Sequence, residues 1–202
     1  MKDLYNIVEG LFDIDSNKEF DDKYTKGKSQ EDIDWMMEHS HPKDNKELKD
    51  TIYEYCNKYG WKSDLNWIDV SKITSMSNLF WGTKFNGDIS KWDVSNVISM
   101  SMMFDSTPFN GDIKDWNVSK VKNMNWLFRY SQFHNNIENW DVRNVEYMRG
   151  MFAYSEFDGK LTKWKPNKVT RAEDIFHECQ MKDYPDWYKK WYGIGKNSPI
   201  LR

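Results

Sequence analysis

The stretch DIDSNKEFDDKY opens like a calcium-binding loop, because Asp13, Asp15 and Asn17 stand at alternate positions. A loop of this type needs glycine at its sixth position and a bidentate glutamate at its twelfth. Lys18 and Tyr24 stand at those two positions. We therefore expect no calcium site here, although the carboxylates have the spacing of a metal loop.

Zinc chemistry and nucleotide chemistry have equally weak support. Residue types that bind zinc lie two apart in two places, His39 with His41 and His177 with Cys179. A zinc site needs about four ligands in paired spacings, so two separate pairs are insufficient. The sequence contains no phosphate-binding glycine loop, no nucleophile elbow and no HExxH motif. We expect no metal, no cofactor and no enzyme activity.

Composition narrows the class of partner. The formal net charge is −3 and no basic block stands out, so we do not expect a nucleic-acid partner. Aromatic residues make up 16% of the chain, so the rings either fill a core or face a partner. The first residues lack the pattern of a secretory signal, and no apolar run is long enough to span a membrane. We therefore expect a cytoplasmic protein without membrane insertion.

A repeat of 24 residues must position these rings. The same residue types recur at this step in several columns: Trp92, Trp116, Trp140 and Trp164; Phe80, Phe104, Phe128, Phe152 and Phe176; Phe85, Phe109, Phe133 and Phe157. A fixed period of 20–50 residues is typical of a solenoid, in which each unit buries its apolar face against its neighbours. We expect about four to five such coils.

Within one unit, two patterns alternate. Val97, Met100, Met103 and Phe104 share the face of a short helix, with serine before it as the N-cap. The Asn-Gly-Asp that begins at Asn110 has turn chemistry, and a short strand is expected over residues 112–116. The predicted fold is α+β, with a short helix, a turn and a short strand in each coil. The repeated Asn-Gly-Asp is interpreted first as a structural turn.

The unit W-D-V-S-N-V-x-x-M-x-x-M-F-x-x-x-x-F-N-G-D-I resembles the BspA-like leucine-rich repeats, a family also listed as DUF285. The resemblance covers residues 64–181. It implies an LRR-type solenoid used for binding, and it supplies no catalytic residues. Many relatives are exported bacterial surface proteins, whereas short forms without an export signal resemble proteins of phage genomes.

Both ends of the chain lack the repeat. Residues 1–63 are expected to form a helical N-terminal cap, with helices near 4–11, 33–37 and 48–59, the last beginning near Asp44 and ending at Gly60. Residues 182–202 are expected to form an aromatic, helical C-terminal cap around Trp187 and Trp191, leaving 64–181 as the solenoid. An alternative makes the N-terminal segment a separate head with its own enzymatic or RNA-binding activity.

Subtracting the shared columns leaves aromatic and thioether side chains that the repeat does not require: Trp81, Met102, Trp126, Tyr130, Tyr147 and Tyr154. Trp, Tyr and Met are enriched at protein interfaces, so these residues are the candidate partner-binding set. The alternative is that they fill gaps between coils.

The predicted function is a non-enzymatic protein–protein interaction module that is a monomer or a weak oligomer. A first alternative is a phage-encoded inhibitor that binds and blocks a bacterial defence or metabolic enzyme. A second alternative is a bacterial surface or adhesion protein.

Overall fold

The computed structural model describes residues 22–191, and the chain divides into two units between Glu38 and His39. The first unit contains α2 (Asp22–Thr25) and α3 (Gln30–Glu38). Ser29 and Asp32 begin α3 with reciprocal bonds: the Ser29 hydroxyl donates to the Asp32 carboxylate, and the Asp32 backbone N–H donates to that hydroxyl. The helix predicted near 33–37 is confirmed, and the one predicted near 4–11 lies outside the described residues.

The second unit opens with α4 (Asn45–Tyr59), as the sequence predicted. The Asp44 carboxylate accepts hydrogen bonds from the backbone N–H groups of Lys46 and Glu47, at 2.8 and 2.9 Å. The helix ends at Gly60, whose φ of 98° favours glycine. A buried face that includes Leu48 and Ile52 packs into the core.

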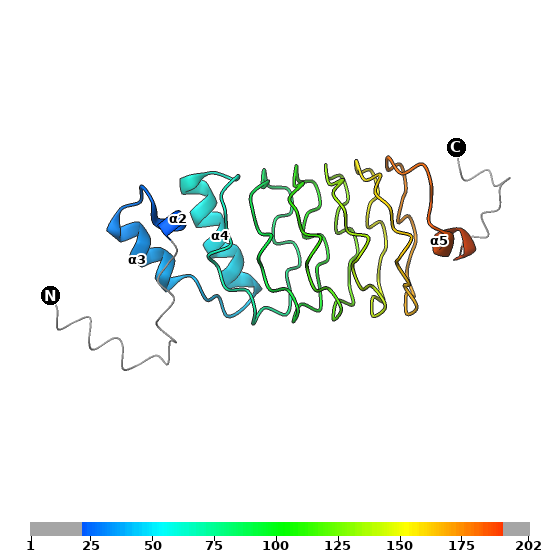
Figure 1. Ribbon diagram of the computed structural model, residues 1–202, viewed down its shortest axis with the longest axis horizontal. Coiled ribbons are helices and arrows are strands. Elements are labelled where there is room, and N and C mark those ends of the chain that lie inside the picture. Colours follow the sequence, from blue (N-terminus) through cyan, green and yellow to red (C-terminus); the bar gives the residue numbers. More distant parts are fainter. Residues whose placement is uncertain (1–21, 192–202) are drawn as a thin grey trace. The chain divides into compact units, whose positions relative to one another are not determined.

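After α4 the repeats form a stack of coils, one coil for each 24 residues (Figure 1). Four backbone N–H groups of each coil donate to carbonyl oxygens of the next coil. In one interface the pairs are Met100 to Asn123, Met102 to Asn125, Phe104 to Leu127 and Ser106 to Arg129, at 2.8–3.0 Å. This ladder keeps every coil in register with its neighbours, and it explains why the 24-residue period does not drift.

The core of the stack consists of aromatic columns. Rings of the column that contains Phe128 lie parallel at centroid distances of 5.5–5.7 Å from one coil to the next. In the column Trp92, Trp116, Trp140 and Trp164, each indole N–H donates to a backbone carbonyl of the preceding coil, for example Trp140 to Ile113 at 3.0 Å. A buried indole needs such a partner, so the tryptophan column supplies both apolar area and a hydrogen bond.

The Asn-Gly-Asp segments are structural, as predicted. The Asn86 side-chain oxygen accepts a bond from the Asn110 N–H of the next coil, and the Asp88 carboxylate accepts one from the Ser90 N–H. A Cβ atom at Gly87 would collide with the Ser63 carbonyl oxygen, so only glycine fits there. In the coils that carry Asn-Gly-Asp, one corner therefore requires these residue types for backbone reasons, whereas the next coil places His134, Asn135 and Asn136 at the same corner.

The predicted α+β fold class is wrong. Between residues 64 and 181 the described chain has no α-helix and no strand, because the helices are confined to the two ends and the bridges are isolated. Parallel bridges join single residues of successive coils, as in Ser75 to Ser99 and Ser99 to Asn123. Consecutive turns make up the rest of each coil. A coil of short helix, turn and short strand is therefore not what this repeat forms.

Two backbone features prevent the predicted helix. The N–H groups of Met100 and Phe104 donate to the next coil, so they cannot donate to carbonyls four residues back, as an α-helix demands. Met102 and Ser106 have φ of 57° and 59°, which a right-handed helix excludes. The predicted N-cap serine, Ser95, instead donates its N–H to the Asp93 carboxylate at 3.0 Å in a side-chain turn.

The last described helix is α5 (Asp186–Trp191), which lies against the final coil. The sequence predicted an aromatic helix in this part of the chain. Its Trp187 indole donates to the Leu161 carbonyl at 3.1 Å and stacks on Trp164 at 6.4 Å, so it continues the tryptophan column. Tyr188 meets Phe176 edge to face at 4.9 Å. The boundaries at 63/64 and 181/182 were drawn from sequence pattern and stay predictions.

The thiol of Cys56 gives a test of the packing around α4. Cys56 is 1% exposed, and burial raises the pKa of its thiol to about 12. We expect no alkylation of Cys56 by iodoacetamide at pH 8 in the native protein and rapid alkylation in urea, because only the thiolate reacts. Because the folded pKa is raised, the contribution of Cys56 to stability should be complete at neutral pH and should decline above about pH 9. Native labelling of Cys56 would contradict this packing.

Candidate functional site

Two surface columns of the stack have a left-handed backbone in every coil. The first column is Asn78, Met102, Trp126, Gly150 and Asp174, and the second is Gly82, Ser106, Tyr130, Tyr154 and Glu178, with φ between 49° and 67°. Glycine adopts this conformation freely and Asn or Asp at small cost, whereas a bulky residue pays about 1–2 kcal/mol. The sequence pattern did not reveal this constraint: each position of the two columns requires a backbone with positive φ.

Trp126 is half-buried at one of these positions, with φ of 55°. Its indole lies over Gly150 of the next coil, where a Cβ atom would come within 2.8 Å of the ring. The guanidinium carbons of Arg129 and Arg149 each lie 5.7 Å from the indole centroid, in the range of cation–π contact. The glycine at 150 thus leaves room for the large ring, and two arginines flank it.

Tyr130 and Tyr154 form an exposed stack beside Trp126. Their rings are nearly parallel, with centroids 4.7 Å apart, and the side chains are 52% and 40% exposed. His177 meets Tyr154 edge to face at 5.0 Å, which extends the ring contacts by one coil. Partial desolvation, with a smaller contribution from the Glu178 carboxylate, raises the pKa of the Tyr154 phenol above its ordinary value.

A partly buried ion pair adjoins two of the rings. The Arg129 guanidinium donates through Nε and Nη2 to one oxygen of Asp105, at 3.0 and 2.6 Å. Asp105 is 0% exposed, and its other oxygen accepts a bond from the Ser106 hydroxyl at 2.9 Å. Arg129 also lies 5.4 Å from the centroid of Tyr130. Sequence reasoning missed this pair, although Asp105 and Arg129 occupy one column with opposite charges and so could have been paired.

The structure brings together only part of the predicted set. Trp126, Tyr130 and Tyr154 form one group that we call the aromatic cluster, since Arg129 contacts the first two rings and Tyr130 stacks on Tyr154. Met102 is half-buried one coil before Trp126 in the same column.

The other two predicted rings are exposed elsewhere on the stack. Trp81 is 51% exposed and Tyr147 37% exposed, and within residues 22–191 no other ring contacts either of them. Tyr147 belongs to the bridge column, between Asn123 and Arg171. Both residues therefore stand apart from the aromatic cluster.

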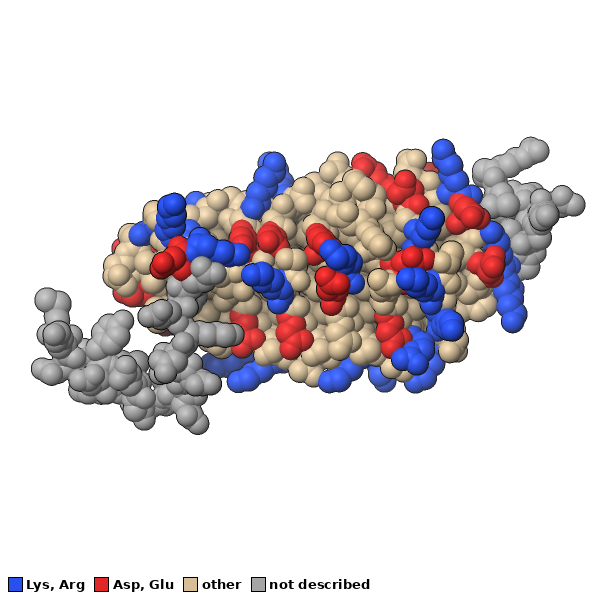
Figure 2. All heavy atoms as spheres, in the orientation of Figure 1, with Lys and Arg blue, Asp and Glu red and all other residues tan. Residues whose placement is uncertain are grey.

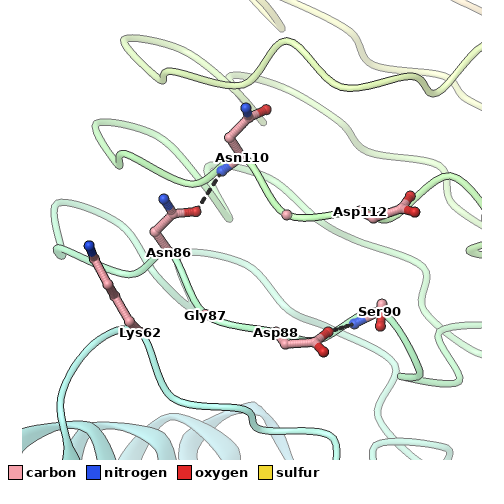
Figure 3. Close-up of a pocket in the computed structure, with 8 residues that line it drawn as sticks. Lys62, Asn86, Gly87, Asp88, Ser90, Asn110 and Asp112 are labelled. Carbon is pink, nitrogen blue, oxygen red and sulfur yellow. Dashed lines mark hydrogen bonds between the residues drawn. The ribbon is translucent and has the colours of Figure 1, made fainter.

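A shallow, open hollow of about 470 Å³ lies over the Asn-Gly-Asp corner (Figure 3). Its lining residues are Lys62, Asn86, Gly87, Asp88, Ser90, Asn110, Gly111 and Asp112. The polar groups are engaged in holding the corner: Asn86 binds Asn110 of the next coil, and Asp112 pairs with Lys114 at 2.5 Å. That bond to Lys114 holds the pKa of the Asp112 carboxyl below its ordinary value. The hollow is thus a by-product of the turn.

The residue pairs considered for zinc lie in separate surroundings. His41 is near Asp69 at 3.8 Å, and His177 is near Glu178 at 3.7 Å. Within residues 22–191, no three His, Cys, Asp or Glu side chains come together as metal ligands would. Asp13, Asp15 and Asn17 of the calcium-like loop lie outside the described residues.

Charges of both signs alternate over the face of the stack drawn in Figure 2. Several oppositely charged side chains pair across neighbouring coils, for example Lys122 with Glu146 at 3.3 Å. In the part of the chain that the structure describes, we find no helix with the length and apolar character that a membrane crossing requires. The surface feature that stands out from this mixed background is the aromatic cluster.

Comparison with known proteins places the repeat in a family. The family model described as "Mycoplasma protein of unknown function, DUF285" matches residues 47–154 and, in a second overlapping segment, residues 109–191. Neither the curated proteins nor the solved structures contain a match to the chain. The two segments extend from α4 through the coil stack to α5 and cover well over half of the sequence. The chain therefore belongs to the DUF285 family, which its repeat predicted.

Proposed function

We propose that this chain is a non-enzymatic protein-binding module and that the aromatic cluster is its contact surface. The observation that carries the proposal is the presence of Trp126, Tyr130 and Tyr154 at backbone positions where large side chains are disfavoured. Other coils place Asn, Gly, Asp, Ser, Met or Glu in the same columns. The three rings, two in one coil and one in the next, have therefore been accommodated at an energetic cost.

Stability of the coils gives little reason for these rings. A bulky residue with left-handed backbone costs about 1–2 kcal/mol. A stacked aromatic pair stabilises the folded state by about 0.5–1.5 kcal/mol. The pair Tyr130–Tyr154 remains about half exposed to water. The two terms nearly cancel, so replacing the tyrosines by asparagine would leave the stack about as stable. Strained residues of this kind are concentrated at binding sites, which supports a role in recognition.

The chemistry of the cluster suits a protein partner. Trp, Tyr and Arg are the residue types most enriched among binding hot spots. Arg129 is held in one conformation by its ion pair with Asp105, so its side chain loses little conformational entropy when a partner packs on it. The Tyr130 and Tyr154 hydroxyls supply polar ends to an otherwise apolar surface. A rigid group of this composition favours contact with another folded protein.

The test compares two tryptophan variants. Trp126→Asn should weaken partner binding by about 2 kcal/mol or more, as truncation of a hot-spot residue does. Asparagine tolerates positive φ and occupies the same column at Asn78, so the melting temperature should change little. Trp81→Ala, which removes an exposed tryptophan outside the cluster, is the matched control and should bind normally. Binding is measured by titration of the partner captured from cells of the source organism.

Two results would contradict the proposal. If Trp126→Asn melts far below the wild type, the indole is part of the core. If both variants bind equally well to a saturable partner, the contact surface lies elsewhere. The phage-inhibitor and surface-protein hypotheses, the cytoplasmic location and the separate N-terminal head stay predictions, because no feature of the described residues favours any of them.

A further inference from the structure

Two arginines contact the indole of Trp126, and the structure pairs only one of them with a carboxylate. Arg129 donates through Nε and Nη2 to the buried carboxylate of Asp105, so its charge is balanced. Arg149 is exposed, and its guanidinium carbon lies 5.7 Å from the indole centroid. Among residues 22–191 no carboxylate lies within ion-pair range of Arg149, and no acceptor lies within hydrogen-bonding range of its guanidinium. The aromatic cluster therefore carries one uncompensated positive charge.

Arg149 leaves a neighbouring carboxylate unused. Glu173 occupies the same column one coil later, and the Gly150 N–H donates to the Glu173 carbonyl at 2.8 Å, so residues 149 and 173 are neighbours across this interface. The Arg149 side chain instead reaches back to Trp126 in the preceding coil. Elsewhere in the stack, opposite charges that share a column do pair across an interface. The orientation of Arg149 is therefore a departure from the pairing pattern of the stack.

The contact with Trp126 leaves the guanidinium of Arg149 available to another molecule. A cation–π contact uses the charge of the group, and it does not consume the N–H donors. Arginine presents these donors as a planar fork, and a carboxylate matches that fork with two parallel hydrogen bonds. Because Arg149 already rests on the ring, it would lose less conformational entropy on pairing than a freely moving arginine. Arg149 is thus suited to receive one carboxylate from outside the chain.

We propose that Arg149 is the specificity-determining residue of the aromatic cluster and that it pairs with a single Asp or Glu side chain set among apolar residues of the partner protein. This inference rests on the proposed function, since it takes the cluster to be the contact surface, and it adds the chemistry that the surface selects. The apolar residues would pack on Tyr130 and Tyr154, whose side chains are 52% and 40% exposed. They would also shield the new ion pair from water, which strengthens its attraction.

The charges of the next coil restrict the partner to one isolated carboxylate. Glu173, Asp174 and Glu178 are exposed there, in columns that continue those of the cluster. A phosphate dianion, or a run of acidic residues, would find one uncompensated arginine and then meet these carboxylates, and like charges brought together at an interface are costly. A single carboxylate with apolar neighbours avoids that repulsion. An acidic side chain therefore fits the site better than a nucleic acid or a phosphopeptide does.

The first test uses the acetylated, amidated tripeptide leucine–glutamate–leucine as the probe. In heteronuclear NMR of the full chain, the tripeptide should shift the resonances of the Trp126 indole N–H and the Arg149 Nε–H in a saturable way. The same tripeptide with glutamine in place of glutamate is the charge control, and inorganic phosphate is the anion control; neither should shift these resonances. In Arg149→Gln the response of the Trp126 indole to the glutamate tripeptide should be lost.

The second test repeats the titration with the partner captured from cells of the source organism. Arg149→Gln should weaken binding by about tenfold or more, as expected for the loss of a charge-assisted, hydrogen-bonded pair. Arg149→Lys should lose part of the affinity, because an ammonium keeps the charge and lacks the planar fork. Arg171→Gln is the matched control: Arg171 is also exposed and also without an ion pair within residues 22–191, and it lies in the bridge column outside the cluster.

The outcomes separate this inference from the proposed function. Wild-type binding by Arg149→Gln together with lost binding by Trp126→Asn would keep the cluster as the contact surface and overturn the acidic partner. Wild-type binding by both variants would overturn both proposals. The inference also fails if the glutamate tripeptide causes no saturable shift, or if the glutamine tripeptide or phosphate causes an equal one. Arg149→Gln should melt like the wild type, because the side chain that it replaces is exposed and unpaired within the described residues.

Discussion

Phe128→Ala is expected to lower the free energy of unfolding by about 3–5 kcal/mol. Phe128 is 0% exposed and lies between the rings of Phe104 and Phe152, at 5.5 and 5.7 Å. Its ring also stacks on Phe133 of its own coil at 4.1 Å. Removing it would leave a cavity in the middle of the stack, where neighbouring coils are held in register and cannot collapse into the gap.

The control for this experiment is Lys122→Ala in the same coil. Lys122 is an exposed residue that pairs with Glu146, and an exposed ion pair contributes about 0–1 kcal/mol. Urea unfolding followed by tryptophan fluorescence should therefore show a large shift of the midpoint for Phe128→Ala and a small one for Lys122→Ala. Equal shifts would show that the inward register of the phenylalanine column is wrong.

Arg129→Met should destabilise the protein by about 3 kcal/mol, the lower end of the range for losing one partner of a buried ion pair. The variant leaves the Asp105 carboxylate buried at 0% exposure with only the Ser106 hydroxyl as a side-chain partner. The Arg129 side chain is itself 32% exposed, which is why we expect the lower end. The midpoint of urea unfolding measures the loss.

Removing both charges should be milder than removing one. Ala153 occupies the same column two coils after Asp105 and is 3% exposed, so the stack accommodates alanine there. Asp105→Ala combined with Arg129→Ala should thus recover part of the stability lost in Arg129→Ala alone, which is the coupling that a double-mutant cycle reports. Strict additivity of the two single changes would mean that the pair contributes no interaction energy.

The repeat register could be predicted from the sequence, and the backbone conformation could not. Identical residues at a 24-residue step, such as Phe104 and Phe128, must stack, because each coil buries its face on the next. The spacing of Val97, Met100, Met103 and Phe104 suggested a helix, because apolar periodicity reports which side chains face inward and not where the N–H groups point. In the structure the N–H groups of Met100 and Phe104 donate to the neighbouring coil, and those of Val97 and Met103 donate to carbonyls three residues back in their own coil.

The candidate site was predicted only in part, again because the types of side chain did not reveal the backbone conformation. The columns that contain Trp126 and Tyr130 were noticed because their residue types vary. Their left-handed backbone was missed, although Gly, Asn and Asp in the same columns are the residues that favour it. Trp81 and Tyr147 also vary, but variation alone does not bring residues together, and both lie outside the cluster.

The most direct test of the central claim is side-chain footprinting of the purified complex by hydroxyl radicals. Binding of the captured partner should reduce oxidation of Trp126, Tyr130 and Tyr154 together, because all three are at least partly exposed in the free chain. Trp81 and Tyr147 serve as internal references of the same residue types and should keep their reactivity. Unchanged oxidation of the three cluster residues, with protection at Trp81 or Tyr147 instead, would contradict the assignment of the aromatic cluster as the binding surface.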